Sequence, residues 1–326
     1  RGMELSVCIV NWNGGDFLPA CLRSVYEGAG DLDLEVIVVD NGSTDGSARE
    51  VERLFPVAKV VDRGRNDGFA AANNVAIARS SGRYLLFLNP DTLVDPGSLE
   101  RMVSFLEEEK AAGALGCRLY HPVTGSVESS ARSNPDLLPL LWNLVYLDRI
   151  FPRSPLFGRY RMSHLPEGER REVDWVTGAC MLARREAVEA AGGFDPGFFM
   201  YCEDIDICMR IRAKGWKIRY LPEASVGHYR GRSSARLREE GEGELSVWGA
   251  GQYARSIIRL YRKHYGGTRT LLLRAMLVGT SCFKILLWLT AGAAARGVRE
   301  GASRARSYAA MIPPAFSDVA PVDRRR

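Results

Sequence analysis

Short apolar runs rich in β-branched residues alternate with segments of helical periodicity along the first part of the chain, and this alternation restricts its possible folds most strongly. Four runs are predicted to be strands: Leu5–Val10, Leu34–Val39, Ala58–Val61 and Tyr84–Leu88. Helices are predicted over Phe17–Tyr26, from about Ser47, and over Phe69–Ser80. Because strands that are apolar throughout have to be covered on both faces, we predict an α/β fold with a mostly parallel sheet and helices on both sides.

Polar side chains stand where three of these strands end. Asn11 and Asn13 follow the first strand, Asp40 ends the second, and Asn89 and Asp91 follow the fourth. Ligands of parallel α/β sheets bind beyond the carboxyl ends of the strands. A turn with a helix cap would explain any one of these positions, but three strand ends of this kind together favour a binding site.

The loops after the strands exclude the common glycine-rich phosphate sites. The first loop reads N-W-N-G-G-D and not G-x-G-x-x-G, so it is not a Rossmann dinucleotide site, and the chain has no P-loop sequence. The G-x-G-T-R type loop of sugar nucleotidyltransferases is absent as well. Without a glycine cradle, the remaining way to hold a diphosphate on such a sheet is a divalent cation bound by carboxylates.

Composition and charge narrow the partners and the compartment. The 326 residues, 46% of them hydrophobic, suffice for one large globular domain or a domain with an appendage. The net charge of +5 accompanies no nucleic-acid-binding motif, so no nucleic acid partner is expected. The seven cysteines include no C-x-x-C pair, which predicts buried free thiols in a reducing compartment. The N-terminus leads almost directly into a strand, so no signal peptide is expected.

Six motifs occur in a fixed order along the chain: V-C-I-V-N-W-N, V-V-D-N-G-S-T-D-G-S, N-D-G-F-A-A-A-N-N, L-N-P-D-T, G-A-C-M-L-A-R-R and F-M-Y-C-E-D-I-D-I-C-M-R. In these motifs the chain resembles the family 2 inverting glycosyltransferases of the GT-A fold, and in particular the bacterial rhamnosyltransferase-like enzymes of cell-surface polysaccharide assembly. The resemblance covers about Leu5 to His228. It implies a GT-A catalytic domain, which we assign to residues 3–240.

The resemblance implies a nucleotide-sugar site at the strand ends. The side chains expected to hold the base and ribose are Asn11, Asn13 and Asp40. An Asp carboxylate suits the imide N–H of uracil or thymine, so a UDP- or dTDP-sugar is the expected donor. The loop expected beside the nucleotide and sugar includes Asn66, Gly68 and Asn73. The alternative for this loop is a helix start with Asn66 or Asp67 as its cap.

The resemblance also implies a divalent cation, Mn²⁺ or Mg²⁺, bridging the protein and the donor diphosphate. Asp91 matches the last carboxylate of the family's metal-binding D-x-D motif, whereas Asn89 replaces the first and is expected to contact the ribose, or the ion through water. A second ligand is therefore needed, and His228 lies where family members often place a metal-binding histidine. Two arginines follow it and would contact the diphosphate if their loop folds over it, or else form a solvated basic loop: Arg230 and Arg232.

Inversion at the anomeric carbon requires a base for the acceptor hydroxyl. Acidic residues in a first helical turn are common for capping and dipole reasons alone, but here they match the family's E-D motif. Asp204 is assigned as the base and Glu203 as its support, while Asp206 and Arg210 are expected to pair along the helix. Three further residues would line the acceptor or donor sugar pocket: Trp175, Thr177 and Gly178.

The rest of the chain carries membrane-like features. Leu137–Phe157 is apolar, aromatic and broken by prolines, which suits either ordinary core or a membrane-surface patch. Ala275–Ala295 is long enough to span a bilayer, but Lys284 lies at its centre. Polar residues gather on one side of this helix, which favours a helix lying in the interface: Arg274, Ser281, Lys284 and Arg296. Residues 241–310 are therefore predicted to be a helical membrane-associated region, with a dimerisation hairpin as the alternative, and 311–326 a basic flexible tail.

These inferences combine into one favoured hypothesis. The chain is expected to be a metal-dependent inverting glycosyltransferase that moves a sugar, L-rhamnose in the favoured case, to a polyprenyl-linked or polysaccharide acceptor. Its expected place is the cytoplasmic face of the bacterial plasma membrane, as a peripheral protein. The alternatives are a sugar nucleotidyltransferase, which would release pyrophosphate, and a non-catalytic membrane scaffold, which would release nothing.

Overall fold

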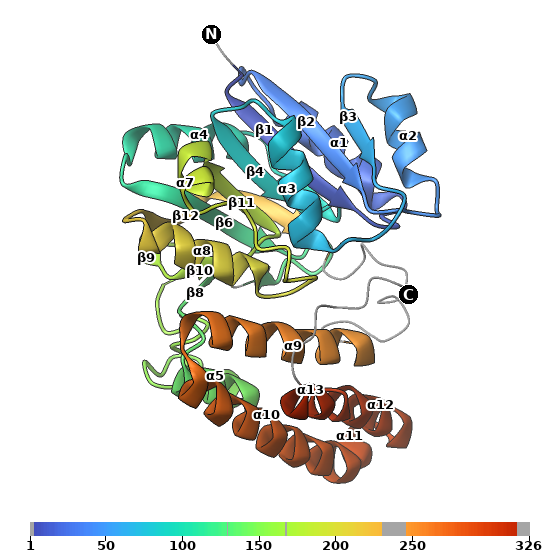
Figure 1. Cartoon of the computed structure of the whole chain (residues 1–326), viewed down its shortest axis with the longest axis vertical. Helices are drawn as coiled ribbons and strands as arrows, with labels where there is room; N and C mark the ends of the chain where they lie inside the picture. The colour runs from blue at the N-terminus through green and yellow to red at the C-terminus, as the bar shows by residue number, and fades with distance from the viewer. Residues whose placement is uncertain (1–2, 129, 167, 230–245, 318–326) are drawn as a thin grey trace. The chain divides into compact units, whose positions relative to one another are not determined.

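The computed structural model describes residues 3–128, 130–166, 168–229 and 246–317, and the chain divides into two compact units (Figure 1). The sheet unit consists of Arg1–Asn134, Leu165–Pro196 and Glu203–Glu239. The helical unit consists of Pro135–His164, Gly197–Cys202 and Glu240–Arg326. Besides the C-terminal part of the chain, the helical unit therefore takes up two segments that interrupt the sheet unit in sequence.

The sheet unit contains most of the elements expected from hydrophobic patterning. Its strands are β1 (Leu5–Asn11), β2 (Leu34–Asp40), β3 (Lys59–Asp62), β4 (Tyr84–Leu88), β5 (Thr92–Val94), β6 (Ala112–Tyr120), β7 (Val127–Glu128), β8 (Ala131–Arg132), β9 (Arg171–Val173), β10 (Trp175–Val176), β11 (Cys180–Arg184) and β12 (Lys217–His228). Its helices are α1 (Phe17–Glu27), α2 (Ser47–Leu54), α3 (Phe69–Arg79), α4 (Ser98–Glu108), α7 (Arg185–Ala190) and α8 (Glu203–Ala213). The four predicted strands and the helices between them are confirmed, with boundaries that agree to about one residue.

Most strands form one mixed sheet in which β3, β2, β1 and β4 run parallel, as predicted. Continuing from β4, the order is β11, β6, β12 and β5. Strand β11 runs antiparallel to both β4 and β6, so the start of β11 lies at the same edge as the end of β4. The register places Asn11 opposite Asp40 and Leu88 opposite Cys180. The carboxyl ends of β1, β2 and β4 and the amino end of β11 therefore share one edge.

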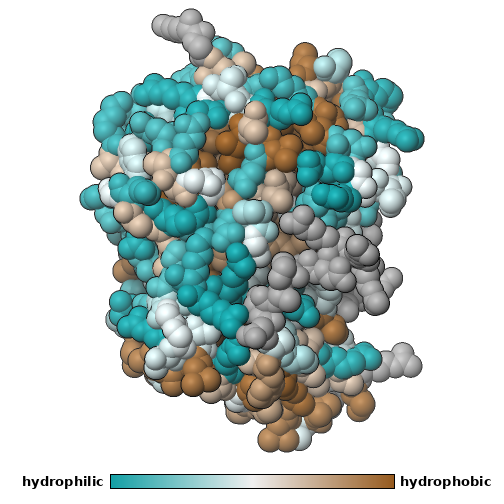
Figure 2. Space-filling view, viewed as in Figure 1, coloured by the Kyte–Doolittle hydropathy of each residue, from teal (hydrophilic) through white to brown (hydrophobic). Residues whose placement is uncertain are grey.

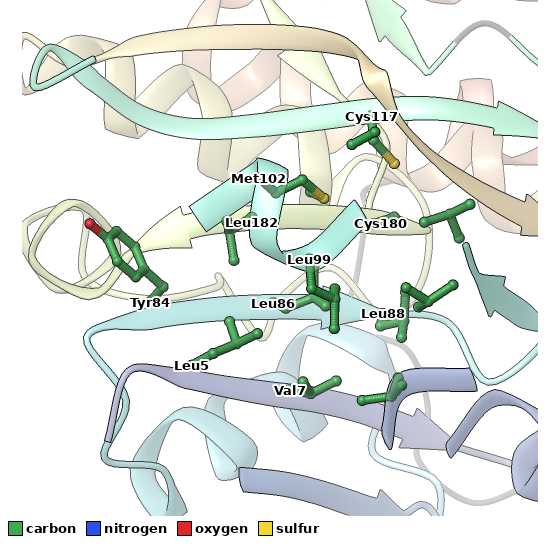
Figure 3. Close-up of a cluster of buried hydrophobic side chains, with 14 of the residues drawn as sticks. Leu5, Val7, Tyr84, Leu86, Leu88, Leu99, Met102, Cys117, Cys180 and Leu182 are labelled. Carbon is green, nitrogen blue, oxygen red and sulfur yellow. The ribbon is translucent and has the colours of Figure 1, made fainter. Parts of the chain in front are cut away.

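One face of the sheet packs against α1 and α4 to form a large apolar core (Figure 3). Alternate residues of β4 contribute to it, namely Tyr84, Leu86 and Leu88, because successive side chains of a strand point to opposite faces. The residues around them in Figure 3 are Leu5 and Val7 of β1, Leu99 and Met102 of α4, Cys117 of β6, and Cys180 and Leu182 of β11. Burial of each such leucine is worth about 1.5–3 kcal/mol, so this face anchors the strands whose ends form the site.

The other face of the sheet is covered as well. Phe87, between two residues of the first core, packs edge-to-face on Phe194 at a ring-centroid distance of 4.9 Å. Met181 of β11 contacts the thiol of Cys208 on α8 at 3.8 Å between the sulfur atoms. The seven cysteines are free, as predicted, and all are buried except Cys282. Both faces of the central strands are thus covered by packed side chains, which explains why the sequences of these strands are unbroken apolar runs.

The helical unit is built from short and long helices. They are α5 (Leu137–Leu144), α6 (Leu147–Ile150), α9 (Val247–His264), α10 (Gly267–Leu287), the π-helical turn η2 (Trp288–Gly292), α11 (Ala293–Arg296), α12 (Val298–Ala309) and α13 (Ile312–Phe316). Helix α10 packs against α9, α12, α13 and α5. Among the described residues, one helical stretch, Gly267–Ala291, has the length and mean hydropathy of 1.6 that would allow it to cross a membrane.

The two sides of α10 have an unusual polarity. Its buried side carries Thr270, Thr280, Ser281 and Lys284 together with two leucines. The Lys284 ammonium lies 4.5 Å from the ring centroid of Tyr146 and 4.6 Å from that of Tyr308, both in the helical unit. The exposed side carries no charged residue over its central turns, from Ala275 to Leu286. Of the polar side predicted from the sequence, Ser281 and Lys284 are therefore packed inward, whereas Arg274 is only half-buried.

Candidate active site

The carboxylate of Asp40 ends β2 and is held in place by its neighbours. Asn11, opposite on β1, donates from Nδ2 to Asp40 Oδ1 at 2.7 Å. Ser43 donates its hydroxyl to the same oxygen at 2.6 Å and its backbone N–H to Oδ2 at 2.9 Å. A carboxylate offers about four acceptor positions, so three bonds leave one for a ligand. Asp40 is only 3% exposed, and these hydrogen bonds fix the orientation of its carboxylate and of the remaining acceptor position.

Asn11 supports Asp40 with both ends of its amide. Its Nδ2 also lies 2.9 Å from the Ser47 hydroxyl, and its Oδ1 accepts the Gly14 N–H at 3.2 Å. A Cβ atom on Gly14 would collide with Asn11 Oδ1, which accounts for glycine at this point of the first loop. Asn11 is fully buried, so we assign it to the support of Asp40 and not to direct contact with a ligand.

Asn13 joins the first loop to the second. Its backbone lies in the left-handed region with φ of 55°, which asparagine tolerates better than most residues. Its Oδ1 accepts the Thr44 N–H at 2.8 Å, and its own N–H donates to the Ser43 hydroxyl at 2.9 Å. The loops after β1 and β2 are therefore one hydrogen-bonded structure around Asp40.

The loop before α3 lies beside the end of β2. Asn66 accepts the Gly68 N–H with Oδ1 at 3.0 Å, but the cap residue of α3 is Gly68, so neither Asn66 nor Asp67 caps the helix as the alternative interpretation expected. Asn41 donates from Nδ2 to the Gly68 carbonyl at 3.3 Å and thereby ties this loop to the residue after Asp40. Asn73 is buried and donates to the Phe69 carbonyl at 3.0 Å. Within the described residues Asn73 Oδ1 has no hydrogen-bond partner, and the start of α3 thus offers one buried acceptor.

The turn Asn89–Pro90–Asp91 is fixed from three sides. Thr92 donates its hydroxyl to the Asn89 carbonyl at 2.7 Å, and the Asn89 N–H donates to the Ala179 carbonyl at 3.0 Å. The Tyr229 N–H donates to the Asp91 carbonyl at 3.0 Å, where β12 pairs with β5. Asp91 is 1% exposed, so its carboxylate is held at the edge of the sheet by a rigid turn.

His228 ends β12 and faces Asp91. Its Nε2 lies 3.5 Å from Asp91 Oδ1, so the structure brings together the two side chains that were predicted to bind a metal. Glu128, which the sequence did not single out, lies 3.2 Å from Nδ1 of the same ring. Although burial lowers it, these two carboxylates raise the pKa of His228 to about 9. The two carboxylates therefore favour positive charge at the His228 ring, either as a proton on the ring or as a metal ion bound to it.

The chemistry of this pair fits a divalent cation. Two ligands of one ion at about 2.1 Å each are roughly 3 Å apart, close to the separation of Asp91 Oδ1 and His228 Nε2. Oxygen and imidazole nitrogen are donors that Mn²⁺ accepts. The described residues contain no group of three or more His, Cys, Asp or Glu arranged to hold an ion. The remaining ligands would have to come from the phosphates of a donor and from water.

Asp204 lies in the first turn of α8 and reaches the start of β11. Its Oδ2 accepts the Gly178 N–H at 3.1 Å, and its Oδ1 accepts the Ile205 N–H at 2.9 Å. Removal of this carboxyl from water raises its pKa, and these N–H groups and Arg132 oppose the rise. Ala179, the residue after Gly178, accepts the Asn89 N–H with its carbonyl. The predicted base Asp204 and the turn Asn89–Pro90–Asp91 therefore lie along one edge of the sheet.

Glu203 is buried beside Asp204, and burial together with the charge of Asp204 raises its pKa well above the usual range. The two residues before it, Tyr201 and Cys202, both have positive φ, at 67° and 63°. Such conformations cost on the order of 1–3 kcal/mol each and persist only where the surroundings impose them. The surrounding structure therefore imposes the backbone turn that precedes α8.

Trp175, Thr177 and Gly178 lead from β10 into β11 next to Asp204. The Trp175 Nε1–H donates to the Ser133 carbonyl at 2.8 Å, and the Arg132 guanidinium lies 5.6 Å from the Trp175 ring centroid. The register pairs Arg132 with Trp175, and this arginine was missed from the sequence because β8 is only two residues long. It adds a positive charge to the side of the site where Asp204 lies.

Asp206 and Arg210 form the ion pair expected along α8, at 2.6 Å, and it is buried. Arg210 also donates to the carbonyls of Ala191 and Gly193, so it binds the end of α7 to α8. This pair is structural and holds the helix that presents Asp204. Arg230 and Arg232 lie outside the described residues.

Comparisons with known proteins give consistent matches. Residues 6–191 match the profile described as Glycosyl transferase family 2. The chain is 34% identical over 243 residues to N-acetylglucosaminyl-diphospho-decaprenol L-rhamnosyltransferase of Mycobacterium tuberculosis, which covers 71% of this chain and 78% of that protein. It is 28% identical over 171 residues to rhamnosyltransferase WbbL of Escherichia coli K12, covering 50% of this chain and 61% of that protein.

A solved structure shares the fold. Mannosyltransferase PcManGT from Pyrobaculum calidifontis, in complex with GDP-Man and Mn²⁺, is similar with a TM-score of 0.55 and 18% identity. The similarity covers 97% of this chain and 88% of that chain. With the profile match, it confirms the predicted GT-A fold.

Proposed function

The chain belongs to glycosyltransferase family 2, and from this membership we propose that it transfers L-rhamnose from a dTDP-sugar donor, with a UDP-sugar as the alternative, to a lipid-linked diphosphate glycan. The rhamnosyltransferase relatives support the sugar and the acceptor class. The observation that carries the proposal is the continuous edge from Asp91 and Asn89 through Ala179 and Gly178 to Asp204, joined by the Asn89–Ala179 backbone hydrogen bond and by the Gly178 N–H to the Asp204 carboxylate. A donor and an acceptor bound along this edge would meet next to a carboxylate.

The donor base would bind at Asp40. Its remaining acceptor position suits the imide N–H that thymine and uracil share and the N1–H of guanine, whereas neutral adenine and cytosine have no ring N–H to donate there. Asn13 and the loop of Asn66, Gly68 and Asn73 lie around this carboxylate and would contact the ribose and the sugar. This chemistry is compatible with a thymidine or uridine diphosphate sugar, and the rhamnosyltransferase relatives favour the thymidine form.

Asp91 and His228 would hold a divalent cation against the donor diphosphate. Such an ion supplies positive charge to the diphosphate as it leaves the anomeric carbon. Mn²⁺ in the structure of the mannosyltransferase of similar fold supports this assignment, whereas Mg²⁺, the alternative, prefers oxygen donors and suits the carboxylate better than the imidazole. Asn89 replaces the other carboxylate of the motif, and its side chain would contact the ribose or water.

Asp204 would accept the proton of the acceptor hydroxyl. The hydroxyl oxygen attacks the anomeric carbon on the face opposite the diphosphate, so one C–O bond forms as the other breaks and the configuration inverts. The raised pKa of Asp204 makes it a better proton acceptor than an ordinary aspartate. Trp175 and Thr177, beside Asp204 in the chain segment that leads to β11, would line the pocket of the reacting sugars.

The helical unit would place the enzyme at a membrane surface, where a polyprenyl-linked acceptor resides. Most exposed large hydrophobic side chains of the described residues belong to this unit, and Figure 2 shows hydrophobic surface over it. They include Leu138, Ile150, Phe151, Leu156, Trp248, Leu271, Leu272, Phe283, Leu286 and Leu289. A surface of this kind marks a membrane or protein contact. We favour peripheral association with the cytoplasmic face, with a homodimer through these helices as the alternative.

The test is a transfer assay with the full chain, dTDP-L-rhamnose and N-acetylglucosaminyl-diphospho-decaprenol in detergent or vesicles. We expect a product one deoxyhexose heavier, formed in the presence of Mn²⁺ or Mg²⁺ and abolished by a chelator. UDP-glucose and GDP-mannose serve as donor controls. Release of pyrophosphate in place of a glycosylated lipid would instead indicate a nucleotidyltransferase, and no turnover of any donor would contradict the proposal.

A further inference from the structure

His228 stands between two carboxylates, one at each nitrogen of its ring. Glu128 Oε2 lies 3.2 Å from Nδ1, and Asp91 Oδ1 lies 3.5 Å from Nε2. All three side chains are largely buried, with exposures of 10% for His228, 14% for Glu128 and 1% for Asp91. The ring is therefore oriented by the protein and only slightly by water.

The sheet itself fixes Glu128 at this place. Glu128 ends β7 and pairs with Leu119 of β6. On its other side, Leu119 pairs with Val226 of β12, two residues before His228. The hydrogen-bonded pairing of β7 with β6 and of β6 with β12 therefore places Glu128 near the end of β12, where His228 lies. The contact follows from strand pairing and is not the chance approach of a surface side chain.

The two carboxylates make opposite demands on a neutral ring, which has one N–H and one bare nitrogen. A proton on Nδ1 lets the ring donate to Glu128 and leaves the Nε2 lone pair directed at Asp91. A proton on Nε2 would donate to Asp91 and leave the lone pair on the side of Glu128. Only the first arrangement allows Nε2 to bind an ion next to the Asp91 carboxylate. The shorter contact, at Nδ1, favours it.

We propose that Glu128 is a positioning residue that holds the proton of the neutral His228 ring on Nδ1, so that Nε2 is available to a divalent cation beside Asp91. This inference rests on the metal-dependent transfer proposed above. Partners of this kind, one layer behind a metal ligand, typically change metal affinity 10–100-fold when removed. Glu128 contacts the ring nitrogen that does not face Asp91, so it orients the ligand and does not share the ion.

The direct test reads the tautomer by ¹⁵N NMR of the histidine side chains, at alkaline pH where the ring is neutral, and needs neither metal nor donor. Wild type should carry the ring proton of His228 on Nδ1. In Glu128→Ala the proton should move to Nε2, where the Asp91 carboxylate can still accept it. Glu128→Gln should keep the wild-type tautomer, because its side-chain carbonyl still accepts from Nδ1. A wild-type ring protonated on Nε2, or an unchanged tautomer in Glu128→Ala, would overturn the inference.

The functional arm measures Mn²⁺ affinity by electron paramagnetic resonance of the free ion, with dTDP present. Glu128→Ala should bind Mn²⁺ about 10–100-fold more weakly than wild type, and Glu128→Gln should lie between the two. The control is Glu172→Ala, which removes an exposed carboxylate from β9, another neighbour of β12, and should leave the affinity unchanged. Equal affinity in all variants would overturn the positioning role. If wild type binds no Mn²⁺, the metal assignment itself fails, and the tautomer measurement still decides what Glu128 does.

Discussion

At the scale of single residues, the two adjacent carboxyl groups that begin α8 differ in what surrounds them. Asp204 accepts two backbone N–H groups, from Gly178 and Ile205. Within the described residues, Glu203 Oε2 is buried and has no hydrogen-bond partner. The pKa of Glu203 is raised well above the usual range by burial and by the charge of Asp204. We infer that Asp204 carries the negative charge of the pair and that Glu203 stays protonated.

This division of charge predicts different outcomes for two isosteric substitutions. Asp204→Asn should lower the transfer rate about 10²–10⁴-fold, because the proton acceptor is lost. Glu203→Gln should change the rate little at neutral pH, because an amide resembles a protonated carboxyl. Since its pKa is raised, Asp204 should give the rate an acidic limb that falls above the usual aspartate range of about 4. Initial rates from acidic to neutral pH check this, and a large rate loss in Glu203→Gln would contradict the assignment.

Asp40 and Asp91 can be singled out from the sequence because they lie at or just after the ends of predicted strands, whereas the roles of Asp204 and His228 are implied by the resemblance to family 2 glycosyltransferases. Glu128 and Arg132 could not be found in this way. They lie on strands of two residues, whose positions depend on pairing with distant parts of the chain. The support that buried Asn11 gives to Asp40 could not be predicted either, because it depends on hydrogen bonds to Asp40 and to the loop after β2.

At the scale of elements, Glu35 joins the amino ends of three strands, at the edge opposite the site. It is a buried carboxylate on β2 that accepts the Ser6 hydroxyl of β1 at 2.8 Å and pairs with Lys59 of β3 at 2.6 Å. The N–H and hydroxyl of Ser81, just before β4, donate to it at 2.6 and 2.9 Å. Although burial raises it, the bonds from Lys59, Ser81 and Ser6 lower the pKa of Glu35 to about 2.

A carboxyl whose folded pKa is below its unfolded value stabilises the fold at neutral pH, and this contribution is lost as the pH falls. Wild type should therefore exceed Glu35→Gln in free energy of unfolding by up to about 3 kcal/mol at pH 6, and the difference should shrink between about pH 4.5 and pH 2. Urea unfolding followed by circular dichroism across this range measures it. Glu50→Gln, at an exposed pair with Arg53, is the control and should show little effect. A pH-independent difference for Glu35→Gln would contradict the argument.

The run L-E-V-I-V-V shows what elements could and could not be predicted. Its apolar residues predict the strand correctly. The role of the single glutamate within it cannot be predicted from this run, because its partners come from β1, β3 and the segment before β4. Short strands such as β5 and β9 were missed for the same reason, since three residues carry too little pattern to be recognised without their partners.

At the scale of the whole molecule, the helical unit has a surface unsuited to water. The outward side of α10 is apolar, while its inward side holds Lys284 between two tyrosine rings. An ordinary surface helix has the opposite arrangement. In α10 the apolar side faces outward and Lys284 is buried within the helical unit. This arrangement suits a helix that lies in the bilayer interface better than one that spans the bilayer, because Lys284 is packed against protein.

This arrangement predicts how the full chain binds vesicles. Phe283→Asp combined with Leu286→Asp should strongly reduce sedimentation with anionic phospholipid vesicles, because both side chains are at least half exposed on α10. The fold should survive, since neither residue is part of a core. Val57→Asp, at an exposed residue of the sheet unit, is the matched control and should bind as wild type does. Undiminished binding of the double variant would exclude this face, and a shift in oligomeric state would favour the dimer.

The helical unit was only partly foreseeable. The apolar run Ala275–Ala295 is a property of the sequence, but α10 begins earlier and ends at Leu287, and the run continues through η2 into α11. The clustering of Ser281 with Lys284 is seen on the buried side of α10. Whether the polar side would face water or protein could not be predicted, because it depends on packing against Tyr146 and Tyr308. These residues come from a segment near α5 and from α12, far apart in sequence.

If Asp91 and His228 bind a nucleoside diphosphate through a divalent cation, calorimetric titration will show nucleotide binding that depends on the metal. Thymidine and uridine diphosphates would be titrated into wild type and His228→Ala, with and without Mn²⁺. We predict that one nucleotide binds tightly to wild type only when Mn²⁺ is present and that His228→Ala loses this gain while keeping the weak metal-free binding. Tight binding that ignores both the metal and the substitution, or no binding of either nucleotide under any condition, would contradict the claim.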